Sequence, residues 1–141
     1  VWAVDSNESD DFYYETSDPT TPSTLYLNRT EKLKSAPAFF DASDLEVQQL
    51  EVTSKDGEKI PYFQINKKGI KLDGTNPTLL EGYGGFEIPN LPVYSPRIGA
   101  AWLEKGGVHV ISCIRGGGEF GPAWHQAGLR THRQDQRHGE A

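Results

Sequence analysis

Residues 108–121 read Val-His-Val-Ile-Ser-Cys-Ile-Arg-Gly-Gly-Gly-Glu-Phe-Gly, an apolar strand pattern that runs directly into a glycine loop. A similar loop, Gly-Tyr-Gly-Gly-Phe at 82–86, follows the apolar run at 78–80. Glycine is used where the backbone turns sharply or approaches a ligand closely. We therefore expect both loops to lie at the carboxyl ends of neighbouring strands, the edge at which open α/β sheets bind ligands.

The segment between the two glycine loops predicts a helix. Residues 96–105 carry apolar side chains at helical spacing, and Gly106-Gly107 ends the pattern. After the second loop, Pro122 stands where the first turn of a helix tolerates proline. The order is strand, loop, helix, strand, loop, helix. It predicts an α/β layer with a mostly parallel sheet.

The chain before residue 77 predicts strands. Residues 12–15 and 24–27 are strand-like and are separated by the turn-rich stretch 18–22. Residues 44–54 and 60–66 are two more candidate strands, joined by a turn that contains Asp-Gly, a strong hairpin signal. We expect an all-β part through about residue 42 and a second sheet from about residue 44.

Composition narrows the class of protein. The 141 residues are 35% hydrophobic and carry a net charge of −6, which is typical of a turn-rich globular protein and unfavourable for nucleic-acid binding. The one basic cluster, residues 130–137, is short and interrupted by Asp135. The sequence contains no run of 18 apolar residues of the kind that spans a membrane, and residues 1–5 lack signal-peptide features. We expect a cytoplasmic or periplasmic location.

The single cysteine and the histidines do not predict a disulfide or a metal site. Cys113 has no partner and lies in an apolar run, so we expect a buried structural thiol. The histidines lack the three- or four-residue spacing that places two ligands on one helix face; they are His109, His125, His132 and His138. We expect no metal or other cofactor, and a capping or core-edge role for His125.

Two catalytic or binding patterns bear on the interpretation of the glycine loops. Gly116, Gly118 and Gly121 satisfy Gly-x-Gly-x-x-Gly, which leaves a dinucleotide-binding domain as an alternative, although Glu119 would face the pyrophosphate. A Gly-x-Ser-x-Gly nucleophile turn is absent from the sequence. A Ser-His-Asp arrangement therefore cannot be assembled from these residues by sequence logic alone.

Several motifs follow one another along most of the chain: residues 67–74 (Lys-Lys-Gly-Ile-Lys-Leu-Asp-Gly), 82–86, 114–121 and Trp124-His125. In this order and at these separations they resemble the prolyl oligopeptidase family of serine peptidases. The resemblance implies that residues 1–43 are the last strands of a β-propeller. It implies that residues 44–141 are the N-terminal portion of an α/β-hydrolase domain, with a divergent tail from about residue 135.

The resemblance also implies roles for the first glycine loop. Tyr83 matches the family tyrosine whose hydroxyl helps bind the oxyanion of the tetrahedral intermediate, and Phe86 matches an aromatic residue of the substrate pocket. Gly84 and Gly85 would let the loop approach the substrate. For Arg115 and Glu119 we expect an ion pair that braces the second loop.

The family's nucleophile, acid and base fall outside residues 1–141, so the chain alone is expected to be inactive. The implied partners are short proline-containing peptides, cut after proline by acyl transfer, and the missing remainder of the hydrolase domain and propeller. A non-catalytic peptide-binding module is a further alternative. Neither nucleic acid nor a membrane is an expected partner.

Overall fold

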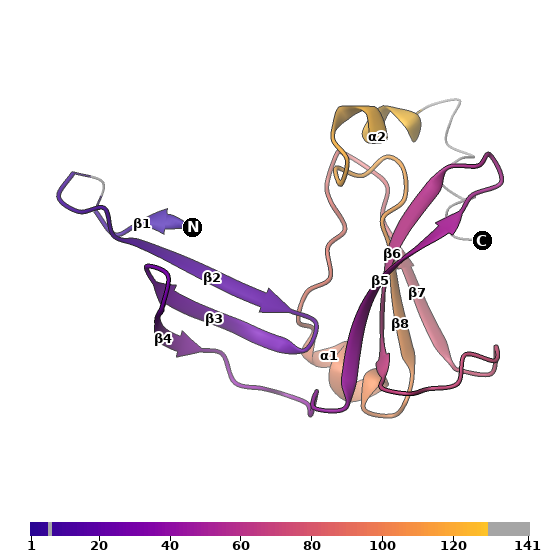
Figure 1. Ribbon diagram of the computed structural model, residues 1–141, viewed down its shortest axis with the longest axis horizontal. Helices are drawn as coiled ribbons and strands as arrows, with labels where there is room; N and C mark the ends of the chain where they lie inside the picture. Colours follow the sequence, from indigo (N-terminus) through magenta and orange to yellow (C-terminus); the bar gives the residue numbers. More distant parts are fainter. Residues whose placement is uncertain (6, 130–141) are drawn as a thin grey trace.

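The computed structural model describes residues 1–5 and 7–129, which form two four-stranded sheets. Figure 1 shows the two sheets side by side, joined by the segment that follows β4. The first sheet contains β1 (Trp2–Ala3), β2 (Phe12–Asp18), β3 (Thr21–Leu27) and β4 (Glu31–Ser35). The second contains β5 (Leu45–Thr53), β6 (Lys59–Lys67), β7 (Thr78–Gly82) and β8 (Val108–Ser112). The described part of the chain is therefore mostly β.

The first sheet is an antiparallel meander in the order β1-β2-β3-β4. Tyr14 of β2 and Tyr26 of β3 stack across the sheet, with ring centroids 4.9 Å apart. The predicted strands at 12–15 and 24–27 are confirmed and are longer than expected. β4 was not predicted, because its sequence, Glu-Lys-Leu-Lys-Ser, lacks alternating apolar residues, and every one of its residues is exposed.

The second sheet has the strand order β5-β6-β8-β7. β5 and β6 form the predicted hairpin, paired from Leu45↔Lys67 to Thr53↔Lys59. Its turn contains Gly57 at φ +90°, a backbone conformation that glycine adopts without strain. The start of a second sheet near residue 44 is confirmed.

The prediction of a mostly parallel sheet is wrong. β7 and β8 are parallel, but β6 pairs with β8 in the antiparallel direction, as does β5 with β6. The helical crossover between β7 and β8 makes that pair parallel, as expected for a connection of this length. β6 belongs to a hairpin and reaches the other edge of β8, and apolar periodicity does not encode the direction of such a pairing.

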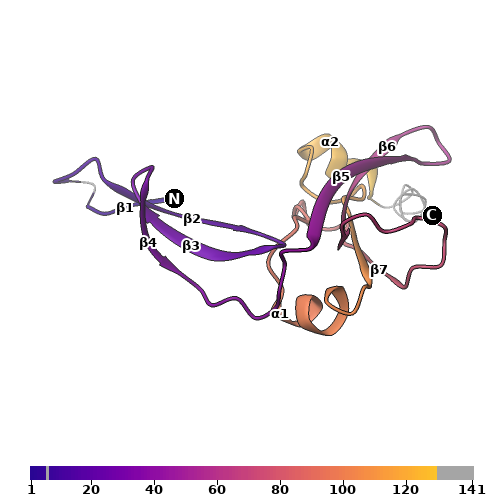
Figure 2. The same ribbon diagram turned by 60° about the horizontal axis from the view of Figure 1, so that its bottom comes forward.

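The predicted helix at 96–105 is confirmed as α1 (Pro96–Ile98), which continues into the π-helical turn η1 (Gly99–Leu103). Ser95 caps it by accepting the Ile98 N–H at 3.4 Å. Figure 1 places this segment at the opposite end of the second sheet's strands from α2 (Pro122–Ala127), and the two also lie apart in Figure 2. Leu103 brings it onto the hydrophobic core, which consists of Phe40, Leu45, Ile65, Leu103 and Ile111.

Across residues 1–5 and 7–129, every helix is too short or too polar to cross a membrane. Some of the predictions fall outside the described residues. They concern the basic cluster at 130–137, the divergent tail from about residue 135, His132 and His138.

Candidate functional site

The two glycine loops leave the same edge of the second sheet. β7 and β8 run parallel with Gly82 beside Ser112, so the segments that follow them begin next to each other. We call residues 83–90 the tyrosine loop and residues 115–121 the triple-glycine loop. The triple-glycine loop leads into α2, which covers this edge in Figure 1. The predicted placement of both loops at the carboxyl ends of neighbouring strands is confirmed.

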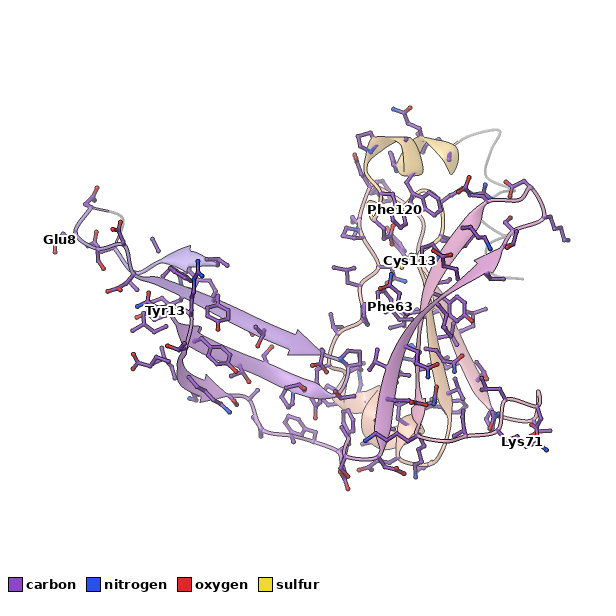
Figure 3. The ribbon with its side chains drawn as sticks, in the orientation of Figure 1. Glu8, Tyr13, Phe63, Lys71, Cys113 and Phe120 are labelled. Carbon is purple, nitrogen blue, oxygen red and sulfur yellow. The ribbon has the colours of Figure 1, made fainter. Side chains whose placement is uncertain are left out.

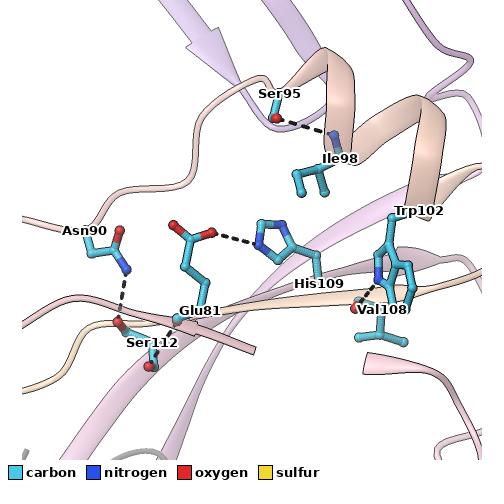
Figure 4. A network of polar contacts seen from close by, with 8 residues as sticks. All are labelled: Glu81, Asn90, Ser95, Ile98, Trp102, Val108, His109 and Ser112. Carbon is cyan, nitrogen blue, oxygen red and sulfur yellow. Dashed lines mark hydrogen bonds and ion pairs between the residues drawn. The ribbon is translucent and has the colours of Figure 1, made fainter. Parts of the chain in front are cut away.

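The tyrosine loop packs directly on the triple-glycine loop. A Cβ at Gly118 would lie 2.0 Å from the carbonyl oxygen of Glu87, a distance that no side chain could accept. The backbone N–H of Asn90 donates to Glu119 Oε1 at 2.8 Å. The Asn90 side chain donates to the carbonyl of Ser112 at 3.3 Å, as Figure 4 shows. These contacts join residues more than 20 positions apart in the sequence, so each loop supports the other.

Tyr83 lies at the surface of this edge. Its side chain folds over Gly85, where an added Cβ would stand 3.6 Å from the phenol oxygen. The residue is 44% exposed, so its ring is not enclosed in the core. Gly84 and Gly85, the next two residues, are half-buried.

Phe86 extends from the loop into solvent and is 83% exposed. Phe86 and Glu87 have φ values of +54° and +56°, in the left-handed region that residues other than glycine rarely adopt. Each such residue costs about 1–3 kcal/mol and persists only where the surroundings hold it. Two such residues in succession make this turn a strained one that neighbouring groups must hold.

His125 stands between the two loops. Its Nδ1 lies 2.7 Å from the carbonyl oxygen of Gly116 and 3.2 Å from the backbone nitrogen of Glu87. Phe120 of the triple-glycine loop lies below α2 in Figure 3. Its ring packs edge to face on that of Trp124 in α2, with ring centroids 5.0 Å apart. Sequence reasoning expected a capping or core-edge role for His125, and it missed this contact with the tyrosine loop 38 residues earlier.

The predicted ion pair between Arg115 and Glu119 is wrong. Arg115 is buried, and its guanidinium pairs with Asp56 in the β5–β6 turn and donates to Ser54 Oγ at 3.2 Å. The hydrogen bond from Arg115 holds the pKa of the Asp56 carboxyl well below its usual range, with a further contribution from Ser54. Arg115 thus braces the start of the triple-glycine loop against the hairpin rather than against its own loop.

The Asp56–Arg115 pair should make the chain sensitive to acid. Because the folded-state pKa of Asp56 is lowered, its stabilisation is fully present above the ordinary aspartate pKa and is lost as the pH falls toward the folded-state value. Asp56→Asn should therefore lower the urea midpoint of unfolding at neutral pH, and this deficit should shrink progressively as the pH falls below the ordinary aspartate pKa. An Asp56→Asn deficit of equal size at pH 7 and at about pH 2 would contradict this.

Two buried groups stabilise the strands that carry the loops. His109 Nε2 lies 3.2 Å from Glu81 Oε2, and Ser112 Oγ donates to the carbonyl of Glu81 at 3.2 Å, so β7 and β8 are joined by side chains as well as by their backbones (Figure 4).

Cys113 is buried as predicted. Burial, with the nearby charge of Glu119, raises the pKa of its thiol to about 11, which keeps it protonated and unreactive.

The Gly-x-Gly-x-x-Gly pattern of the triple-glycine loop allows close packing against the tyrosine loop. The close approach at Gly118 is made by the chain's own Glu87 carbonyl, in the place where a dinucleotide site would need a pyrophosphate. The described residues contain no group of three or more histidine, cysteine, aspartate or glutamate side chains able to hold a metal ion.

Comparison with known proteins finds no matching family model, but it finds clear relatives. The chain is 53% identical over 133 residues to an uncharacterized peptidase, y4nA, of Sinorhizobium fredii, covering 91% of the chain and 18% of the relative. It is 38% identical over 130 residues to the prolyl endopeptidase of Elizabethkingia miricola, covering 89% of the chain and 18% of that enzyme.

Solved structures agree with these relatives. A post-proline cleaving enzyme from Rickettsia typhi is 39% identical with a TM-score of 0.78, matching 92% of this chain and 21% of its own. A structure from a study of two prolyl endopeptidases is 36% identical with a TM-score of 0.88, matching 94% of this chain and 20% of its own.

The sequence and the fold of this chain are homologous to one segment of these peptidases. By these similarities the chain belongs to the prolyl oligopeptidase family. It spans about a fifth of the length of the relatives and structures that it matches.

Proposed function

We propose that this chain contributes the oxyanion-binding loop of a serine peptidase that cleaves short peptides after proline. In this proposal residues 44–141 are the N-terminal portion of an α/β-hydrolase domain, and residues 1–43 are the last strands of a β-propeller. The observation that carries the proposal is the exposed Tyr83 at the carboxyl edge of two parallel strands, in a chain similar to prolyl endopeptidases.

The chemistry assigned to Tyr83 follows from its hydroxyl. When a serine attacks the carbonyl of a peptide, the carbonyl oxygen becomes negatively charged, and a pre-positioned donor lowers the energy of that state. A phenol on a short loop, folded over glycine, is a donor whose position is restricted before the substrate arrives. Tyr83 would act together with a backbone N–H beside the nucleophile, which lies outside the described residues.

The chemistry assigned to Phe86 is apolar contact. A proline ring offers an aliphatic face, and an exposed aromatic ring on a strained backbone can cover that face. Gly84 and Gly85 leave room for the peptide backbone next to it. We use the term parent peptidase for the polypeptide that would hold these residues together with the nucleophile, acid and base.

Phe86→Ala should raise KM of the parent peptidase for a proline-containing chromogenic peptide by about tenfold, because burying one aromatic side chain is worth about 1.5–3 kcal/mol. The value of kcat should change little, since the contact is similar in the ground and transition states. Steady-state kinetics measure both constants. Ile88→Ala, at an exposed residue of the same loop, is the control and should leave both unchanged.

The outcomes separate the proposal from a non-catalytic peptide-binding module. Serine-reagent-sensitive turnover with a Phe86-dependent KM supports the peptidase. Binding of the proline peptide without turnover by the parent polypeptide would favour the binding module instead. The 141-residue chain alone should give no turnover, and cleavage by it would refute the assignment of the nucleophile to another segment.

A further inference from the structure

His125 makes a contact that the proposed function does not use. Its ring reaches from α2 to the backbone of Glu87, in the left-handed turn that carries Phe86. We propose that His125 is a positioning residue, which holds the Phe86–Glu87 turn and thereby sets the placement of Phe86 and Tyr83. Its importance for activity rests on the function proposed above for the tyrosine loop.

The turn needs a support from outside its own loop. Phe86 and Glu87 are both left-handed, and the backbone hydrogen bond that spans them within the loop runs from Ile88 N–H to the Gly85 carbonyl at 3.1 Å. Neither residue is glycine, so the conformation is costly and requires surroundings that fix it. The described residues that supply such contacts to Glu87 are Gly118, through the close approach to its carbonyl, and His125, through its N–H.

Of the two contacts of His125 Nδ1, the one with Glu87 connects α2 to the tyrosine loop, whereas the one with Gly116 stays within the triple-glycine loop and α2. Nδ1 of the neutral ring either carries a proton and donates to Gly116 or presents a lone pair and accepts from Glu87. α2 is already joined to the triple-glycine loop through the bond from Gly116 N–H to the Trp124 carbonyl at 2.9 Å. Between the described residues of α2 and the tyrosine loop, the hydrogen bond that forms the connection is the one from Glu87. Holding the turn requires the Nε2–H tautomer, because a ring protonated at Nδ1 donates to the Gly116 carbonyl at 2.7 Å and cannot accept from Glu87.

The backbone of His125 is itself held in place within α2. The His125 N–H donates to the Gly121 carbonyl at 3.2 Å, and the adjacent Trp124 packs edge to face on Phe120. Because α2 is held in this way, the position of the His125 ring relative to the sheet edge is restricted. The ring in turn restricts Glu87, which is adjacent to Phe86, and Phe86 lies three positions after Tyr83 in the same loop.

Amide hydrogen exchange of the 141-residue chain tests the contact directly. In the unsubstituted chain we expect the Glu87 amide to be protected. His125→Phe keeps a planar ring without nitrogen and should speed exchange at Glu87 by about tenfold or more. His125→Asn places an amide oxygen where Nδ1 stood and should retain the protection. The amides of Ile65 and Ile111, in the two central strands, report whether each variant remains folded.

The nitrogen resonances of His125 supply a second readout that a purely structural role would not produce. We expect Nδ1 to be unprotonated and hydrogen-bonded in the unsubstituted chain. A protonated Nδ1 together with an unprotected Glu87 amide would overturn the proposal. Equal protection of Glu87 in the unsubstituted chain and in a folded His125→Phe variant would also overturn it.

Kinetics in the parent peptidase test the consequence for the loop. His125→Phe should lower kcat/KM about tenfold, and His125→Asn should restore most of it. Unchanged kcat/KM in His125→Phe, while Tyr83→Phe is impaired, would overturn the positioning role and leave the proposed function intact. If Tyr83→Phe is unimpaired but the Glu87 amide loses protection in His125→Phe, the proposed function fails and the hold on the turn is supported.

Discussion

Replacing Tyr83 by phenylalanine should lower kcat of the parent peptidase about 100-fold. Loss of one oxyanion donor removes about 3 kcal/mol of transition-state binding, which corresponds to roughly that factor in rate. KM should stay within about twofold, because the uncharged carbonyl of the bound peptide gains little from the phenol. The substitution removes a single oxygen from a surface side chain, so folding should be unaffected.

The measurement is steady-state hydrolysis of a proline-containing chromogenic peptide, with circular dichroism to confirm the fold. Tyr26→Phe is a matched control, because it removes a tyrosine hydroxyl from the first sheet while keeping the ring that stacks on Tyr14. It should leave kcat unchanged. A Tyr83→Phe enzyme as fast as the unsubstituted one would remove Tyr83 from the oxyanion site.

Gly118→Ala should destabilise the chain by about 2 kcal/mol, within the range of 1–3 kcal/mol for overpacking a tight contact. The added Cβ would stand 2.0 Å from the Glu87 carbonyl oxygen, a backbone atom that cannot move aside without displacing the left-handed turn. The tyrosine loop would separate from the triple-glycine loop. In the parent peptidase we therefore expect a loss of activity as well as of stability.

Urea unfolding followed by fluorescence measures the free-energy difference. Gly85→Ala is the matched control in the same site, since a Cβ there would lie 3.6 Å from the nearest atom, an ordinary van der Waals distance. It should change the free energy of unfolding by much less. Equal stability of Gly118→Ala and the unsubstituted chain would show that the two loops are not in contact at this position.

Local patterns predicted much of the fold. The Asp56-Gly57 turn predicted the β5–β6 hairpin, because a two-strand hairpin depends on residues that are adjacent in sequence. The helical spacing at 96–105 predicted the crossover that makes β7 and β8 parallel. From that pairing alone, the two glycine loops had to leave the same edge of the sheet.

Contacts between distant segments could not be predicted in this way. Arg115 was expected to pair with Glu119, four residues away, but its partner Asp56 is 59 positions earlier. The antiparallel pairing of β6 with β8 was missed for the same reason, as was the approach of His125 to Glu87. Each depends on how whole strands are arranged, which no window of the sequence contains.

The positions of the hairpin turn, the crossover helix and the two glycine loops follow from local backbone preferences and apolar spacing, so residues close together in the sequence specify them. The motifs that indicate the family are likewise visible along the chain. The partner of Arg115 and the side chain that holds the Phe86–Glu87 turn, in contrast, depend on the folded arrangement of the sheet. An ion pair or a strained turn is stabilised by groups that meet only after the sheet has formed.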